Sequence, residues 1–145
     1  MREIKFRGKR LDNGEFVEGY FQIVRDCTGK YYWINDFLGN IHDVDPETVG
    51  QYIGFKDISQ SEIYEGDILE FEDIGEEGYE YIEGYDFTNR AKVVYRNARF
   101  ELEAIRESDS AVFEDMRNCH DDFVGIFKIS KVIGNIHDNP ELLEV

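Results

Sequence analysis

The residues with the clearest chemical potential are acids and tyrosines in the middle of the chain. Between Asp57 and Asn89 the sequence contains twelve acidic residues and no lysine or arginine. Carboxylates attract a basic surface over long range, and aromatic rings supply the contact area that carries binding energy. We therefore predict a surface that binds a basic protein, formed by Glu72, Asp73, Glu76, Glu77, Tyr79, Glu80, Tyr81, Glu83 and Tyr85.

The charge of the whole chain narrows the classes of partner. The 32 acidic and 16 basic residues give a formal net charge of -16, which repels nucleic acid and anionic membranes. We therefore expect no direct nucleic-acid partner and no membrane partner. Runs of like charge are often only solvated surface, so the alternative is that the acidic segment does no more than keep the protein soluble.

The residues that usually carry metal or nucleophilic chemistry are few and scattered. Cys119 and His120 are adjacent, and on a strand adjacent side chains point to opposite faces, so they do not form a nucleophile and base pair. Cys27, His42 and His137 do not have the spacing of metal ligands. We expect no cofactor, no metal and no catalytic residue among them.

Carboxylate chemistry offers two further alternatives. The acids Asp43, Asp45 and Glu47 alternate, and the acids at 73, 76 and 77 cluster, but neither stretch has the residue order of an EF-hand calcium loop. A pair of carboxylates for glycoside hydrolysis cannot be picked out, because acids are so abundant. A small enzyme that depends on carboxylates or a divalent metal stays an alternative to a binding protein.

The elements that must position these residues read as short strands. Asn13-Gly14 separates two alternating runs and predicts a β-hairpin, because both turn residues tolerate positive φ. A second turn at residues 26–29 leads into Tyr31-Tyr32-Trp33-Ile34, whose side chains favour a strand. The N-terminal part of the chain is therefore predicted to be a β-meander.

The rest of the chain also favours strands. We expect strands at residues 48–55 and 62–71 with a bend at Gly66, a hairpin over residues 92–105, and the last strands over residues 123–133. Helical periodicity is weak and predicts only single turns near residues 109–117 and 140–143.

One pentapeptide, Gly-Asn-Ile-His-Asp, occurs twice, at residues 39–43 and 134–138. Five residues are too few to indicate duplication, and glycine, asparagine and aspartate are typical of turns. We expect the same turn at both places, with His42 and His137 as turn or interface residues rather than ligands.

Five basic residues near the start oppose the acidity of the rest: Arg2, Lys5, Arg7, Lys9 and Arg10. Alternate residues of a strand share a face, so several of them could bind the acidic segment of a second copy and form a homo-oligomer. The alternative is an exposed edge strand that charge protects from aggregation.

Three stretches carry a resemblance to a known family. They are MREIKFR at residues 1–7, TVGQYIGFKD and EIYEGDI at residues 48–57 and 62–68, and VIGNIHDNPEL at residues 132–142. The chain resembles the YopX family of phage and prophage proteins at both ends and in the middle. The resemblance implies a β-rich fold and a phage or prophage origin, and it implies no catalytic residues.

Together these patterns predict a mainly β protein with minor helical turns. We expect an N-terminal β-meander over residues 1–56 and a small SH3-like β-barrel over residues 57–145, with an acidic insertion at about residues 72–89. The expected function is a non-enzymatic phage accessory protein that binds a basic protein. The two cysteines form no CxxC pair and no stretch has the length of a spanning helix, so we expect the cytoplasm of the bacterial host.

Overall fold

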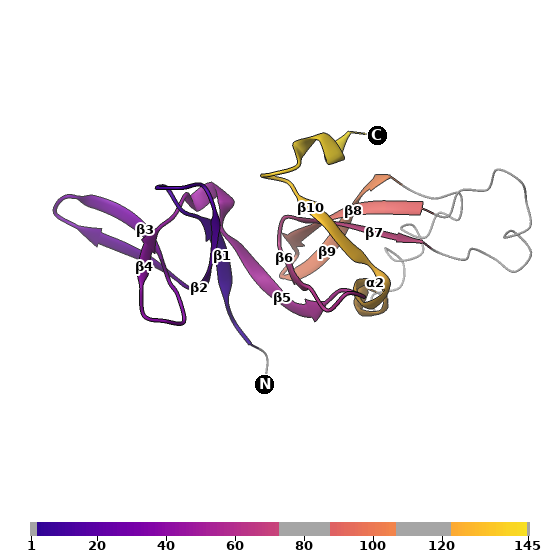
Figure 1. Cartoon of the computed structure of the whole chain (residues 1–145), viewed down its shortest axis with the longest axis horizontal. Helices are drawn as coiled ribbons and strands as arrows, with labels where there is room; N and C mark the ends of the chain where they lie inside the picture. Colours follow the sequence, from indigo (N-terminus) through magenta and orange to yellow (C-terminus); the bar gives the residue numbers. More distant parts are fainter. Residues whose placement is uncertain (1–2, 73–87, 107–122, 145) are drawn as a thin grey trace, which may run out of the picture. The chain divides into compact units, whose positions relative to one another are not determined.

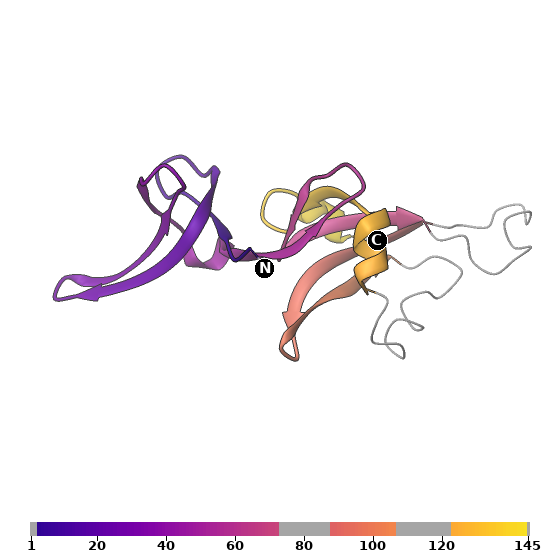
Figure 2. The same cartoon turned by 90° about the horizontal axis from the view of Figure 1, so that it is seen from below.

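The computed structural model describes residues 3–72, 88–106 and 123–144, and the chain divides into two compact units, residues 1–54 and 55–145 (Figure 1). The described residues form ten strands in two antiparallel sheets and one short α-helix (Figure 2). The expected mainly β class is confirmed. Neither sheet closes into a barrel within these residues, so the expected SH3-like barrel is not confirmed.

The N-terminal unit is a meander, with the strand order β4-β3-β2-β1-β5. Gly14 has φ +71 in the turn between the first two strands, as the Asn-Gly pattern predicted. Its elements are β1 (Phe6–Lys9), β2 (Phe16–Asp26), β3 (Gly29–Asn35), β4 (Ile41–Asp43), the 3-10 helix η1 (Pro46–Thr48) and β5 (Gly50–Lys56).

The core of this unit lies where β1, β3 and the start of η1 meet. Ile34 and Val44 are buried, and the absence of a side chain at Gly8 leaves room for both of them. Gly19 has a similar role, because a Cβ there would overlap the carbonyl oxygen of Asn35. The two glycines therefore let β1 and β2 approach the strands and side chains beside them.

The basic residues of β1 are not on an edge strand, because β1 lies between β2 and β5. The edge-protection hypothesis is therefore wrong. Lys5 is buried with its ammonium 5.0 Å from the centre of the Tyr52 ring, and Arg7 and Lys9 lie over the Phe16 ring at 4.6 and 5.5 Å. These cations contact aromatic rings of their own unit, which stabilises cation and ring together.

β2 extends well beyond its first neighbour. Its pairing with β1 ends at Gly19, whereas its pairing with β3 continues to Asp26 and closes through the turn Cys27-Thr28. β4 pairs with β3 from Trp33 to Asn35. Residues 20–32 therefore form an arm beyond β1, which has two strands only from Ile23 to Tyr32 and which Figure 1 shows extending past β1 and β4.

The C-terminal unit contains a four-stranded sheet with the order β10-β7-β8-β9. Residues 55 and 56 at the end of β5 also belong to this unit, where a turn joins them to β6. Its further elements are β6 (Glu62–Tyr64), β7 (Asp67–Glu72), β8 (Thr88–Arg96), β9 (Arg99–Arg106), α2 (Phe123–Ile129), β10 (Lys131–Asn135) and the 3-10 helix η3 (Pro140–Leu143).

The core of this unit is built on β7 and β8, and it contains Ile63, Tyr64, Ile68, Leu69, Phe71, Ala91, Val93 and Leu102. The predicted bend at Gly66 is present, with φ +90, and the predicted hairpin of β8 and β9 turns at Asn97 and Ala98. Both turn residues have positive φ, +54 and +61. Alanine is a poor residue for that backbone conformation, because its Cβ crowds the following carbonyl group.

The segment expected to supply the last strands is partly helical. Residues 123–129 form α2, and β10 begins only at Lys131. Phe127 is buried and its ring stacks on Phe55 at 5.7 Å, while the amide of Ser130 donates to the carbonyl of Ile126. Aromatic and β-branched content favoured a strand here, but packing of one ring on the core decides the conformation. The helical turn at 140–143 is confirmed, and the one expected at 109–117 lies outside the described residues.

The repeated pentapeptide does not form the same turn twice. Ile41, His42 and Asp43 form β4, whereas Ile136, His137 and Asp138 form a turn after β10. The expectation of one reused turn is therefore wrong.

Candidate functional site

The structure describes one residue of the predicted acidic surface. Glu72 is exposed at the end of β7 and lies opposite Thr88, the first residue of β8. The two ends of the acidic segment are thus held side by side. The other eight predicted residues lie outside the described residues: Asp73, Glu76, Glu77, Tyr79, Glu80, Tyr81, Glu83 and Tyr85.

Two acids of the stretch between Asp57 and Asn89 are buried and stabilise the fold. Asp57 is buried and its carboxylate accepts hydrogen bonds from the amides of Ser59, Ser61 and Val132, which ties the turn before β6 to β10. Asp67 is also buried and accepts from the amide of Tyr64 at 2.8 Å. Buried carboxylates of this kind orient the backbone and offer nothing to a partner.

The basic residues of β8 and β9 pair largely with acids of the same sheet. The Arg90 guanidinium lies 3.2 Å from Glu70, and the Arg99 side chain lies 2.6 Å from Glu101. Glu103 receives both Arg96, at 2.6 Å, and Lys92, at 3.6 Å. Each of these four cations therefore has an acidic partner within its own sheet.

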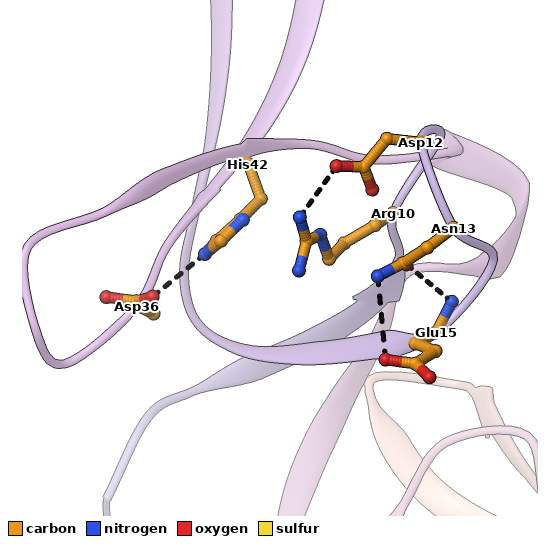
Figure 3. Close-up of polar contacts among 6 residues, drawn as sticks. All are labelled: Arg10, Asp12, Asn13, Glu15, Asp36 and His42. Atoms are coloured by element: carbon orange, nitrogen blue, oxygen red, sulfur yellow. Dashed lines mark hydrogen bonds and ion pairs between the residues drawn. The ribbon is translucent and has the colours of Figure 1, made fainter.

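A second candidate site is a cleft of about 380 Å³ in the N-terminal unit (Figure 3). It lies between the turn after β1 and strand β4, which are joined by a hydrogen bond from the Leu11 amide to the Asp43 carbonyl. Its lining residues are Arg10, Leu11, Asp12, Ile41, His42 and Asp43. Leu11 and Ile41 expose more than half of their surface, so the cleft has apolar as well as charged walls.

A histidine and a carboxylate form the least exposed polar pair beside this cleft. The Nε2 atom of His42 lies 2.8 Å from Oδ2 of Asp36 (Figure 3). The other oxygen of Asp36 accepts hydrogen bonds from the amides of Leu38 and Asn40. The hydrogen bond to His42, followed by that from the Asn40 amide, lowers the pKa of Asp36 from 3.8 to about 2. Hydrogen bonding to the charged form is the cause, and it outweighs the opposite effect of desolvation.

The remaining charges of the cleft also have partners. The Arg10 guanidinium donates to Asp12 at 2.6 Å and lowers the pKa of that carboxyl group (Figure 3). The Trp33 indole donates to Asp43 at 2.8 Å. Chemically, the cleft offers a histidine oriented by a carboxylate, which is the arrangement of a general base, but no hydroxyl or thiol in its lining.

Sequence reasoning placed His42 in a turn and missed its bond to Asp36. The available signal was the spacing of six residues, because a short turn between paired strands brings such residues together. His137 lies in a turn as expected, Cys27 is exposed at the tip of the arm, and Cys119 and His120 lie outside the described residues.

The carboxylates considered for calcium have other roles where they are described. Asp43 binds the Trp33 indole, and Asp45 caps η1 through the amide of Glu47. Among residues 3–72, 88–106 and 123–144, no three histidine, cysteine or carboxylate side chains are placed to hold a metal ion. In the same part of the chain, no helix is long and apolar enough to cross a membrane.

Comparison with known proteins identifies relatives of the whole chain. The family model described as YopX protein matches residues 5–144. The crystal structure of protein EF1440 from Enterococcus faecalis is similar, with a TM-score of 0.55 and 25% identity over 99% of this chain and 100% of that chain. No curated protein matches the chain.

Proposed function

Because this chain belongs to the YopX protein family, we propose that it is a phage or prophage accessory protein that binds a basic protein in the bacterial cytoplasm. It acts by binding and catalyses no reaction of its own. The observation that carries the proposal is the unequal distribution of charge between the two units.

Acidity is concentrated in the C-terminal unit. Residues 1–54 contain 7 basic and 9 acidic residues, a net charge of -2, and residues 55–145 contain 9 basic and 23 acidic residues, a net charge of -14. Four of those nine basic residues are paired with acids of β7 and β9. A basic partner is therefore attracted mainly to this unit, at distances up to about 10 Å at 0.1 M salt.

The position of Glu72 supports the acidic segment as the contact region. Glu72 is exposed at the point where the acidic segment leaves β7. β7 itself is paired with β10 on one side and with β8 on the other. The tyrosines that follow in the sequence supply the rings that bury well at an interface. A rigid sheet thus presents the start of a segment that combines charge with aromatic contact area.

The test compares the native chain with a variant in which Glu76, Glu77, Glu80 and Glu83 are glutamine. Both are used to capture proteins from a bacterial host lysate across a salt series. We expect the native chain to retain a basic protein that salt releases, and the variant to retain at least tenfold less of it, because charge supplies the long-range attraction.

A matched control removes the same charge elsewhere. Glutamine replaces Glu15, Glu18, Glu47 and Glu144, which are all exposed. This control should bind as the native chain does, and circular dichroism should show that all three proteins are folded. Equal retention by both four-glutamine variants would mean that net charge alone governs binding and that the acidic segment is not the contact region.

A second candidate function is a small carboxylate-dependent enzyme, which the pair of His42 and Asp36 beside the cleft favours. Chromogenic phosphate, ester and glycoside substrates would test it. Activity that disappears in His42→Gln and persists in the acidic-segment variant would support the enzyme and contradict a pure binding role.

A further inference from the structure

The outer edge of the arm is an open strand edge. In β2 the residues paired with β3 by hydrogen bonds alternate with residues whose amide and carbonyl groups point away from β3. Asp26 and Gly29 close a two-residue turn and so form a hydrogen-bonded pair, which makes Phe21, Ile23 and Arg25 the outward-pointing residues. Within the described part of the chain, no strand pairs with β2 along this edge after Gly19.

The side chains along this edge do not protect it fully. Phe21, Ile23 and Arg25 lie on one face of the arm, and Ile23 is 50% exposed. Arg25 is exposed and has no carboxylate within ion-pair distance among the described residues. Open edges that combine apolar side chains with free backbone groups are templates for pairing with another strand.

We propose that a second copy of this chain pairs antiparallel with β2 along this edge, with Ile23 on the two-fold axis. The free stretch runs from Tyr20, after the pairing with β1 ends, to Asp26, before the turn, and Ile23 is its centre. A centre nearer to β1 would drive the second copy into the β1 strand, and a centre nearer to the turn would shorten the paired stretch. The interface is the same patch on both copies, as two-fold symmetry requires.

This register makes the edge complementary to itself. Ile23 faces Ile23 of the second copy, and Phe21 faces Arg25 of the second copy, so each free guanidinium reaches an aromatic ring. Phe21 is already held in place by ring contacts with Phe6, at 5.7 Å, and Tyr32, at 6.3 Å. A pre-positioned ring loses less side-chain freedom when the cation arrives.

Charge also favours this place of contact over others. Two copies of net charge -16 repel each other, but residues 20–32 contain two basic residues and one acid. The arm is therefore a part of the surface where two copies approach without adding acid to acid. Because one strand edge is a small interface, we expect a dimer that dissociates on dilution.

Disulfide trapping tests the register. In a Cys27→Ser, Cys119→Ser background, Ile23→Cys places two thiols at directly opposite positions, about 5.5 Å apart between Cα atoms, which a disulfide can bridge. Under oxidised glutathione we expect most of this variant to form a covalent dimer. Gln22→Cys in the same background is the control. In this register the two residues at position 22 lie diagonally across the interface, about 7–8 Å apart between Cα atoms, and on the opposite face of the sheet from Ile23.

Sedimentation over a concentration series tests the association itself. The native chain should show a monomer–dimer equilibrium, and Ile23→Lys should raise the dimer dissociation constant at least tenfold by placing two ammonium groups opposite each other. Gln22→Lys adds the same charge on the opposite face and should change the constant less than threefold. A native chain that stays monomeric at all concentrations, or equal crosslinking at positions 22 and 23, would overturn the proposal.

Discussion

Residues 39–43 and 134–138 have the same five side chains, Gly-Asn-Ile-His-Asp, in two different conformations. In the first copy Gly39 has φ +88 and the last three residues form β4. In the second copy the glycine and asparagine end β10, and the last three residues form a turn. Different hydrogen bonds hold the two conformations.

The residue whose side chain organises the backbone lies in a different place in each copy. Before the first copy, Asp36 accepts hydrogen bonds from Leu38 and Asn40 and binds His42, so an acid in the preceding segment organises the pentapeptide. In the second copy the carboxamide of Asn135 accepts from the amides of His137 and Asp138, so the asparagine within the pentapeptide organises it. A short sequence therefore has no fixed structure of its own: an acid outside the pentapeptide organises the first copy, whereas the asparagine within it organises the second.

The largest expected effect follows from the different roles of the two asparagines. Asn135→Ala should lower the free energy of unfolding by about 3 kcal/mol, because it leaves two backbone amides of a part-buried turn without their acceptor. Asn40→Ala should change it by at most about 0.5 kcal/mol, because that side chain is exposed. Urea unfolding followed by circular dichroism measures both, and equal losses would show that the two copies depend on asparagine alike.

Substitution of the two glycines should give a smaller difference between the copies in the free energy of unfolding. Gly134→Ala should cost about 2 kcal/mol, because a Cβ there would overlap the Asn139 carboxamide and the Leu142 side chain. Gly39→Ala meets no neighbour and should cost about 1 kcal/mol for its left-handed backbone alone. The same unfolding experiment applies, and a larger loss at Gly39 would contradict the packing argument.

The smallest expected effect is the change in stability of the first copy at low pH. The pKa of Asp36 is lowered to about 2, so its contribution to stability is fully present above about pH 4 and is lost as the pH falls toward 2. Asp36→Asn should therefore reduce the loss of stability between pH 4 and pH 2. Fluorescence of Trp33, the single tryptophan, measures the unfolding of this region at each pH. An unchanged pH dependence would mean that the Asp36 bonds do not stabilise β4.

Much of the fold could be predicted from turn chemistry. Asn13-Gly14 and Gly66 mark turns because positive φ is needed there, and the hairpin of β8 and β9 follows from its alternating side chains. Residues 123–129 could not be predicted in the same way, because their helix depends on the burial of Phe127 against Phe55, which is far away in the sequence. Contacts between distant residues override local preference.

Less of the site could be predicted. The pattern of acids predicts a binding segment after Glu72, but it gives no means of separating surface acids from Asp57 and Asp67, which are buried and accept hydrogen bonds from backbone amides. The bond between Asp36 and His42 depends on the geometry of the turn between β3 and β4, which composition does not encode. Charge is visible in a sequence, whereas the partner that each charge finds depends on the fold.

The left-handed alanine in the turn of β8 and β9 has a consequence for the order of folding. Because Ala98 disfavours its native φ of +61 in a free chain, the turn gains its stability from the strands that it joins and should form after them. Ala98→Gly should then slow unfolding several-fold and leave the folding rate nearly unchanged in stopped-flow experiments. A faster folding rate would instead place this turn in the folding nucleus, and the hairpin would be the first part of the C-terminal unit to assemble.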